Sequence, residues 1–341
     1  MKPIRVFEAF AGIGAQAMAL KNAQIPHEIV AISEIDKHAV KSYMAIHGIT
    51  ENLGDITKIE FIPETDLWTY SFPCQDISVM GKGMGFKKNS QTRSGLLWEI
   101  ERLLDSSKKP KYLLMENVPM IVSRKFIKDF NLWISTLSSY GYLSNWFKLN
   151  SMNFGIPQNR ERVFMISSLD GTIISQPKPQ HLDITLSDIL ENKVEDKYYL
   201  KKEQIEKANF YNKKIDYSNS RCIQMGELKG KWNHDNAIYS IYGLSPTITT
   251  KGSLKILIKN NAGDYTIRRL TPLECWRLMG FSDKAFYAAK NIGISERQLY
   301  KQAGNSIVIP VLEAVFKEMF LPENKKIKQK TLLTYKSQRK V

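Results

Sequence analysis

Cysteine is scarce in this chain, and the three that occur, Cys74, Cys222 and Cys275, are far apart among 341 residues. An odd number of widely spaced cysteines does not fit a disulfide framework, and no two of them have the spacing of a zinc site. This pattern indicates a reducing compartment, and we expect no metal.

Long apolar runs are lacking as well. No run approaches the length of a membrane span, and Glu8 interrupts the N-terminal apolar stretch, which makes that stretch a poor signal peptide. We therefore expect a soluble, cytoplasmic protein. Its length and its 43% of hydrophobic residues allow a sizeable core and suit two domains.

Acidic residues are in the minority, with 34 Asp and Glu against 49 Lys and Arg, so the formal net charge is +15. Part of the excess lies in the tail at 323–341, and the remainder is spread over the rest of the chain. A solvated, lysine-rich surface and a polyanionic partner, most simply nucleic acid, explain this charge about equally well.

Short apolar runs alternate with helical patterns through the first half of the chain. Strands are expected at 4–10, 28–33, 67–72, 112–115 and 162–167, and helices at 16–22, 36–47, 95–104 and 126–140. This alternation predicts an α/β fold with a doubly wound, mostly parallel sheet. From about residue 176 to 264 the pattern is irregular, with strand-like pieces such as 237–241, and helical periodicity returns at 272–279 and 309–319.

Polar residues follow several of the expected strands. Gly12 and Gly14 come after the first strand, Glu34 after the second, Cys74 after a later one and Glu116 at the end of the next. Ligands of doubly wound sheets bind outside the carboxyl ends of the strands. The sequence therefore predicts a functional site at this edge.

Cys74 stands in a turn that directly follows an apolar strand, within Pro73-Cys74-Gln75. Proline removes a backbone donor, so it ends the strand and exposes the next side chain. Because the thiolate form of cysteine is a nucleophile, Cys74 is a candidate for covalent catalysis.

The run from Gly12 to Gly14 lies between a strand and a helix, where glycines allow a nucleotide-like ligand to approach the backbone. Glu34, about 20 residues further on, is positioned to accept hydrogen bonds from ribose hydroxyls. With Ala17 the run also satisfies G-x-G-x-x-A, so a dinucleotide-binding dehydrogenase and a plain tight turn remain alternatives. Asp55 either caps a helix or holds an adenine amino group, and the local pattern favours the cap.

Glu116, Arg160 and Arg162 complete the candidate chemistry. When a thiolate adds to an electron-poor ring, negative charge develops on a ring nitrogen, and a carboxylic acid at the position of Glu116 could protonate that nitrogen. A surface glutamate before a turn is the alternative. Arg160 and Arg162, at period two, should share one strand face. Two guanidinium groups on one face suit a carboxylate, a phosphate or a ring carbonyl, and an exposed strand edge is the alternative.

Taken together, these segments resemble the signature blocks of the DNA (cytosine-5) methyltransferases of the bacterial restriction–modification type, in the family's order. The matching blocks are residues 10–14, 54–56, 71–75, 94–99, 115–118, 158–162, 269–275 and 304–306. Ala15 stands where the family often has glycine, a mild departure.

The resemblance implies a mechanism in which the target cytosine is flipped out of the duplex. Cys74 would add to C6 of the base, protonated Glu116 would donate to N3, Arg162 would hold O2, and Arg160 would support the thiolate and a nearby phosphate. C5 would take the methyl group of S-adenosylmethionine, a base would remove the C5 proton, and Cys74 would leave. Gln75 belongs to the same catalytic block.

The resemblance also implies binding residues. Those expected around S-adenosylmethionine are Phe10, Gly12, Gly14, Glu34, Asp55, Ile56, Pro73, Leu96 and Asn305. The stretch 76–93 would be a lid, with a disordered surface loop as its alternative. The expected DNA contacts are Ser78, Lys82, Lys87, Lys88, Arg93 and Thr247. The segment around Thr247 differs from the family's usual Thr-Leu because Ile248 follows.

The implied partner is double-stranded DNA with a short specific site, bound by a monomer at the nucleoid of a bacterial cell, with a separate restriction endonuclease as a possible companion. We expect a catalytic and cofactor-binding domain at 1–170 and 300–322, a β-rich target-recognition domain at 171–265, a hinge segment at 266–299 and a basic tail at 323–341. A cytosine-5 transfer-RNA methyltransferase, a nicotinamide dehydrogenase and an inactive DNA-binding module remain as alternatives.

Overall fold

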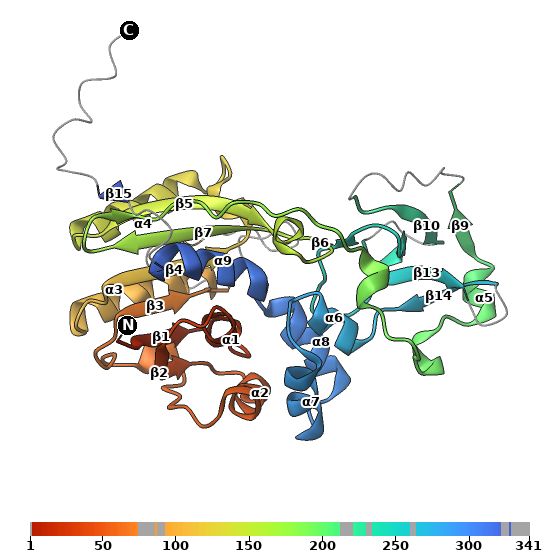
Figure 1. Cartoon of the computed structure of the whole chain (residues 1–341), viewed down its shortest axis with the longest axis horizontal. Coiled ribbons are helices and arrows are strands. Elements are labelled where there is room, and N and C mark those ends of the chain that lie inside the picture. Colours follow the sequence, from red (N-terminus) through yellow and green to blue (C-terminus); the bar gives the residue numbers. More distant parts are fainter. Residues whose placement is uncertain are drawn as a thin grey trace, which may run out of the picture.

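The computed structural model describes residues 2–73, 86, 93–211, 221–229, 234–259, 264–321 and 327–328. Two sheets lie toward opposite ends of an elongated molecule, and a group of helices stands between them (Figure 1). Among the described residues, no helix combines the length and the apolar character needed to cross a membrane.

The larger sheet has six strands in the order β2-β1-β3-β4-β7-β5. Its strands are β1 (Ile4–Ala9), β2 (His27–Ser33), β3 (Leu67–Tyr70), β4 (Tyr112–Asn117), β5 (Leu143–Asn150) and β7 (Glu161–Ser168). The first four run parallel, whereas β7 is antiparallel to both β4 and β5. The prediction of a doubly wound, mostly parallel sheet is confirmed.

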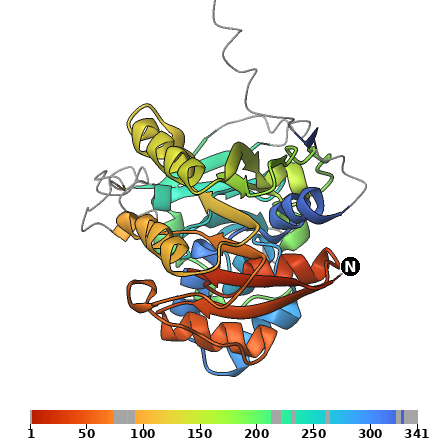
Figure 2. The ribbon, with the colours of Figure 1, turned by 90° about the vertical axis from the view of Figure 1, so that its left-hand side faces the viewer.

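Helices cover both faces of this sheet (Figure 2). They are α1 (Ala15–Asn22), α2 (Lys37–His47), α3 (Leu97–Ser106), α4 (Ile127–Ser139) and α9 (Ile309–Phe320). Because successive strand residues point to opposite faces, Val6 and Leu67 pack in the core with α1 and α9, whereas Phe7 and Trp68 pack with α3 and α4. The two apolar layers fix the orientation of the strands and hence the place where their carboxyl ends meet.

The smaller sheet has five strands in the order β14-β13-β11-β10-β9. They are β9 (Ala208–Phe210), β10 (Gln224–Leu228), β11 (Ala237–Ser240), β13 (Lys255–Lys259) and β14 (Tyr265–Arg269). Only the β11–β13 pair of this sheet is parallel. Its edge strand β14 runs on to Arg269, beyond residue 265, where we expected the smaller domain to end.

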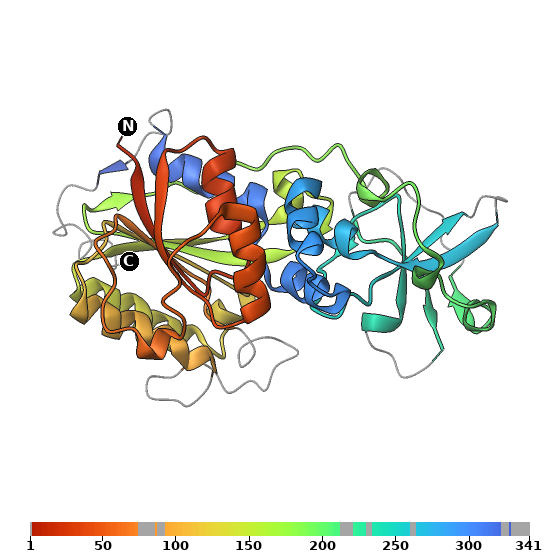
Figure 3. The ribbon, with the colours of Figure 1, turned by 90° about the horizontal axis from the view of Figure 1, so that it is seen from below.

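Three helices connect the sheets: α6 (Pro272–Arg277), α7 (Asp283–Asn291) and α8 (Glu296–Asn305). Figure 3 shows them between the two sheets, next to α2. Gln302 of α8 donates hydrogen bonds to His38 O and Ser42 Oγ of α2. At the other end, Arg268 of β14 forms a buried ion pair of 2.7 Å with Glu274 of α6. The helices therefore bind to both parts of the molecule.

Candidate functional site

The turn that joins β1 to α1 forms the first part of the candidate site. Phe10, Gly12 and Gly14 all have positive φ angles, of 56°, 58° and 78°. This conformation costs little for glycine but is uncommon for a residue with a side chain such as Phe10. The backbone N–H of Gly12 donates to Glu34 Oε2 at 2.9 Å, so the turn is fixed to the end of β2.

Glu34 is held by backbone groups on both sides. Its Oε1 accepts from Asp36 N at 2.7 Å, and the Asn52 side chain hydrogen-bonds the backbone N–H and C=O of Glu34. Each carboxylate oxygen retains a lone pair for a further donor. Ile35, the next residue in the chain, was not predicted as a site residue and is 72% exposed. A large apolar side chain with so little cover next to an anchored acid is the signal that identifies it.

Asp55 caps the short helix η1 (Ile56–Lys58), as the local pattern favours. Its Oδ1 accepts from Thr57 N at 3.0 Å and from Thr57 Oγ1 at 2.8 Å. These hydrogen bonds hold the pKa of Asp55 below its usual value. Ile56 is buried. Arg102 of α3 donates to the carbonyl oxygens of Ile56 and Ile59, so this segment is tied to the helix that Leu96 precedes.

The second part of the candidate site lies at the ends of β3 and β4. Ser71 Oγ donates to Glu116 Oε2 at 2.7 Å, and Arg162 Nε lies 3.4 Å from Glu116 Oε1. Glu116 is only 8% exposed. Burial of a carboxyl group is acceptable only where such partners satisfy its oxygens. Ser71 was not among the predicted site residues, although it follows β3 within the same block.

The chain between Ser71 and Pro73 is anchored on both sides. Asn117 Nδ2 donates to Phe72 O at 3.0 Å, and Ser94 Oγ donates to Pro73 O at 2.6 Å. The segment that leads to Cys74 therefore starts beside Glu116. Six predicted residues lie outside the described part of the chain, as does the side chain of Arg93. The six are Cys74, Gln75, Ser78, Lys82, Lys87 and Lys88.

Arg160 and Arg162 reach different partners. Arg162 lies at Glu116, whereas the guanidinium group of Arg160 is buried and donates to backbone carbonyl oxygens. The acceptors are Ser306 at 2.9 Å, Gly304 at 3.1 Å and Ile248 at 3.4 Å. The described contacts of Arg160 therefore join three distant segments, and its expected contact with a thiolate or phosphate stays a prediction.

Thr247 lies in the same region, where residues 158–160, 245–250 and 304–306 meet; we call this region the junction. Its Oγ1 donates to Asn159 O at 2.7 Å, next to the parallel pairing of β6 (Gln158–Asn159) with β12 (Ser245–Pro246). Gln158 is fully buried, accepts from Ile248 N at 3.0 Å and donates to Leu278 O at 2.8 Å. The segment that carries Thr247 is thus fixed against the strand that leads to Arg162.

Asn305 is exposed at the end of α8, between residues that this junction binds. A Cβ on the preceding residue, Gly304, would lie 2.5 Å from Thr250 N. Only glycine therefore allows the end of α8 to approach the loop after Thr247 so closely. This contact sets the position of Asn305.

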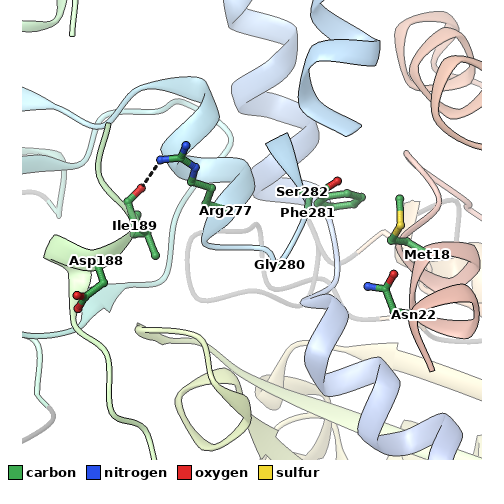
Figure 4. A pocket seen from close by; sticks show the side chains of 8 residues that line it. All are labelled: Met18, Asn22, Asp188, Ile189, Arg277, Gly280, Phe281 and Ser282. Carbon is green, nitrogen blue, oxygen red and sulfur yellow. Dashed lines mark hydrogen bonds between the residues drawn. The ribbon is translucent and has the colours of Figure 1, made fainter. Parts of the chain in front are cut away.

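A cavity of about 300 Å³ lies elsewhere. It is lined by Met18 and Asn22 of α1, by residues of η5 (Leu186–Ile189), by Arg277 and by residues 280–282 (Figure 4). Arg277 donates to Ile189 O at 2.9 Å and pairs with Asp283. The cavity includes none of the predicted site residues. No group of three or more His, Cys, Asp or Glu side chains in the described part of the chain could hold a metal ion.

Comparisons with known proteins identify relatives that match nearly the whole chain. The family model of the C-5 cytosine-specific DNA methylases matches residues 4–321. The chain is 39% identical, over 373 aligned positions, to the type II methyltransferase M2.ScrFI of Lactococcus lactis subsp. cremoris, with 93% of this chain and 99% of that protein covered. It is 33% identical to the orphan methyltransferase M.SssI of Spiroplasma monobiae, with 92% and 96% covered.

Solved structures show the same fold. The Dnmt2 methyltransferase of S. pombe superposes with a TM-score of 0.69 at 21% identity, covering 94% of this chain and all of that one (100%). A putative DNA modification methyltransferase encoded within an E. coli prophage gives a TM-score of 0.66 at 19% identity, again with 94% and 100% covered.

Proposed function

Because the chain belongs to the C-5 cytosine-specific DNA methylase family, we propose that it methylates C5 of a cytosine within a short, specific site of double-stranded DNA, with Cys74 as the covalent nucleophile. Membership of this family implies S-adenosylmethionine as the methyl donor and DNA as the substrate.

The observation that carries the residue assignment is the hydrogen bond between Ser71 and Glu116. It fixes the start of the segment Ser71-Phe72-Pro73-Cys74 beside a buried carboxyl group at the end of the neighbouring strand. A thiolate that adds to a pyrimidine ring needs a proton donor within hydrogen-bond reach of the ring nitrogen. The arrangement thus supports Glu116 as the acid for a nucleophile at Cys74.

In this mechanism the Cys74 thiolate forms a bond to C6 of the flipped-out cytosine. The electron pair of the C5–C6 double bond moves toward N3, where Glu116 donates a proton. The resulting enamine carbon C5 accepts the methyl group, and the electron pair of the donor's S–C bond stays on sulfur. A base then removes the C5 proton, the sulfur of Cys74 leaves C6 as a thiolate, which restores the C5–C6 double bond, and the proton on N3 returns to Glu116.

Arg162 and Arg160 have different parts in this proposal. Arg162 Nε holds the Glu116 carboxyl group, and its position at the strand end suits a contact to O2 of the base. Arg160 carries its positive charge in the buried junction of residues 158–160, 245–250 and 304–306. There it would support the thiolate of Cys74 and a nearby phosphate, with Gln75 in the same catalytic block.

The residues around the glycine turn fit the methyl donor. Apart from Gly12 itself and its two chain neighbours, no described residue has an atom within 4 Å of the place where a Cβ on Gly12 would stand, so the backbone there is open to a ligand. Glu34 offers fixed carboxylate oxygens to ribose hydroxyls, and exposed Ile35 offers apolar surface to an adenine ring. We propose that the donor is held there by the predicted residues: Phe10, Gly12, Gly14, Glu34, Asp55, Ile56, Pro73, Leu96 and Asn305.

The DNA would lie between the two sheets and contact residues from both. Thr247, on the segment bound to β6, would pack beside the flipped nucleotide, with Ser78, Lys82, Lys87, Lys88 and Arg93 at the phosphates. The smaller sheet, all but one strand of which lies within the proposed target-recognition domain at 171–265, would read the site, with 266–299 as the hinge. A net charge of +15 favours a polyanion. We propose that the enzyme acts as a monomer in the cytoplasm, with any restriction endonuclease as a separate protein.

The experiment begins with expression in bacteria that lack cytosine methylation, followed by bisulfite sequencing, which identifies the methylated site. Duplexes with 5-fluorocytosine at that site should then trap a covalent complex that survives a denaturing gel, because fluorine cannot leave as a proton does. Cys74→Ser should give no adduct, whereas the matched variant Cys222→Ser should give as much as the wild type. An adduct with Cys74→Ser, or none with the wild type, contradicts the proposal. Transfer RNA serves as the competing substrate.

A further inference from the structure

A buried carboxyl group lies beneath the glycine turn. Glu8 of β1 is fully buried, and Tyr43 of α2 donates to its Oε2 at 2.9 Å. Burial raises the pKa of Glu8 to about 7, although the Tyr43 hydroxyl and the Ala17 N–H in the first turn of α1 act in the opposite direction. Glu8 thus connects three elements that surround the turn.

The second contact to the turn comes from the next turn of α2. His47 Nε2 lies 3.1 Å from Ile13 O, and the rings of Tyr43 and His47 are 4.7 Å apart. A carbonyl oxygen only accepts, so Nε2 carries the proton. Burial lowers the pKa of His47 to about 4, and the ring is therefore neutral at physiological pH. His47 consequently acts as a hydrogen-bond donor to the turn.

Gly14 shows how closely α2 packs against the turn. A Cβ at Gly14 would lie 2.4 Å from His47 Nε2 and 2.7 Å from the Tyr43 ring. Gly14 is also the N-cap of α1 and provides no side-chain acceptor for the first N–H groups of the helix. The ionised carboxyl group of Glu8 places negative charge near these groups, where the helix dipole favours it.

We propose that Glu8, Tyr43 and His47 are positioning residues for the methyl donor. Their contacts set the backbone conformation of residues 10–14 and thereby the affinity of the turn for the donor. None of them is among the residues assigned to donor contact. The inference rests on the proposed function, because it takes this turn as the donor site.

The proposal includes a pH response. When Glu8 loses its charge, the attraction to the start of α1 is lost, so the donor should bind more weakly at pH 6 than at pH 8. The groups that face Glu8 are Tyr43 from α2 and Thr69, its partner in register on β3, whose hydroxyl has no partner among the described residues. Lys21 and His27 act on His47, also from outside the turn.

Tyr43→Phe tests the positioning role, with Tyr142→Phe as the matched control. Tyr142 is likewise buried and donates to a backbone oxygen, Pro110 O, at 2.7 Å, on the other side of the sheet. Titration calorimetry with S-adenosylhomocysteine and steady-state kinetics on methylatable DNA should show Kd and the donor KM raised about tenfold in Tyr43→Phe, with kcat within about twofold. Tyr142→Phe should leave all three values unchanged.

Glu8→Gln tests the charge, because the amide keeps the size and the acceptor oxygen of the carboxyl group. The wild type should bind S-adenosylhomocysteine about fivefold more weakly at pH 6 than at pH 8, and Glu8→Gln should bind equally at both. Equal effects of Tyr43→Phe and Tyr142→Phe, or an intact pH response in Glu8→Gln, would overturn the inference. If the wild type neither binds this ligand nor methylates DNA, the proposed function itself has failed.

Discussion

Ser71 Oγ donates a 2.7 Å hydrogen bond to Glu116 Oε2, across 45 residues of sequence. The two residues lie at the ends of β3 and β4, which pair in parallel through Tyr70 and Met115. The pairing places the two strand ends side by side, and the hydrogen bond then fixes which way the carboxyl group points. The proposed catalytic acid and the segment that leads to the proposed nucleophile are therefore aligned by the sheet itself.

Ser71→Ala should lower kcat about tenfold, because the loss of one hydrogen bond to the proposed catalytic carboxyl group of Glu116 corresponds to roughly 1.4 kcal/mol. The donor KM should not change, since Glu34 and the glycine turn are untouched. Steady-state methylation kinetics measure both values. Ser144→Ala is the control, because Ser144 shares a 2.7 Å hydrogen bond with Ser167 at the far edge of the sheet. An equal loss of kcat in both variants contradicts the assigned role.

Arg160→Lys should destabilise the fold by about 2–3 kcal/mol, since an ammonium group cannot reach the carbonyl oxygens of Ile248, Gly304 and Ser306 together. Urea denaturation followed by circular dichroism gives the free energy of unfolding. In the control, Arg5→Lys, the exposed pair with Glu28 is retained and the change should stay below about 0.5 kcal/mol. Similar values for the two variants would show that Arg160 does not tie the junction together.

Gly14→Ala should cost more stability than Gly155→Ala, although both glycines are in the left-handed region, with φ angles of 78° and 79°. The backbone strain of alanine, about 1 kcal/mol, is common to both. Only at Gly14 would the new methyl group collide with His47 and Tyr43, whereas nothing beyond the neighbouring residues lies within 4 Å at Gly155. Thermal unfolding should therefore show a lower Tm for Gly14→Ala, together with loss of donor binding that Gly155→Ala does not show. Equal Tm values would contradict the close packing of α2 on the turn.

Glu8 should make stability depend on pH. Its pKa is about 7 in the folded protein, against 4.5 for an exposed glutamate, so the native state binds the proton more tightly. Its contribution is then fully present below pH 4.5 and is lost as the pH rises through 7, by about 3 kcal/mol in total. Glu8→Gln lacks this titration. Urea denaturation at pH 5 and pH 8 should show the variant gaining stability relative to the wild type at the higher pH, and a constant difference would contradict it.

The strongly patterned elements of the fold could be predicted from sequence. The strands at 4–10, 28–33, 67–72, 112–115 and 162–167 all appear, because each is an apolar run that is buried in the sheet. The edge strand β5 was missed, since its residues alternate between buried and exposed positions and carry Asn, Ser and Lys. Helices α7 and α8 were also missed, because only one side of each is buried and their composition is largely polar.

The candidate site likewise has features that could be predicted from sequence and features that could not. Glycine spacing and position at strand ends predicted that Gly12, Glu34 and Glu116 lie at one edge of the sheet, because parallel strands bring their ends to one edge whatever the details of packing. The different partners of Arg160 and Arg162 could not be read from period two. Arg160 stands between β6 and β7, and its acceptors come from segments 88 to 146 residues away.

What the sequence determined by itself was the order of strands and turns, and with it the chemistry available at the sheet edge, because local pattern and residue type suffice for both. The tertiary structure decided which of those groups meet. Contacts such as Ser71 with Glu116, or Tyr43 with Glu8, depend on strand pairing and helix packing between distant segments. No local property of the chain specifies those distances, since the packing of both core layers sets them together.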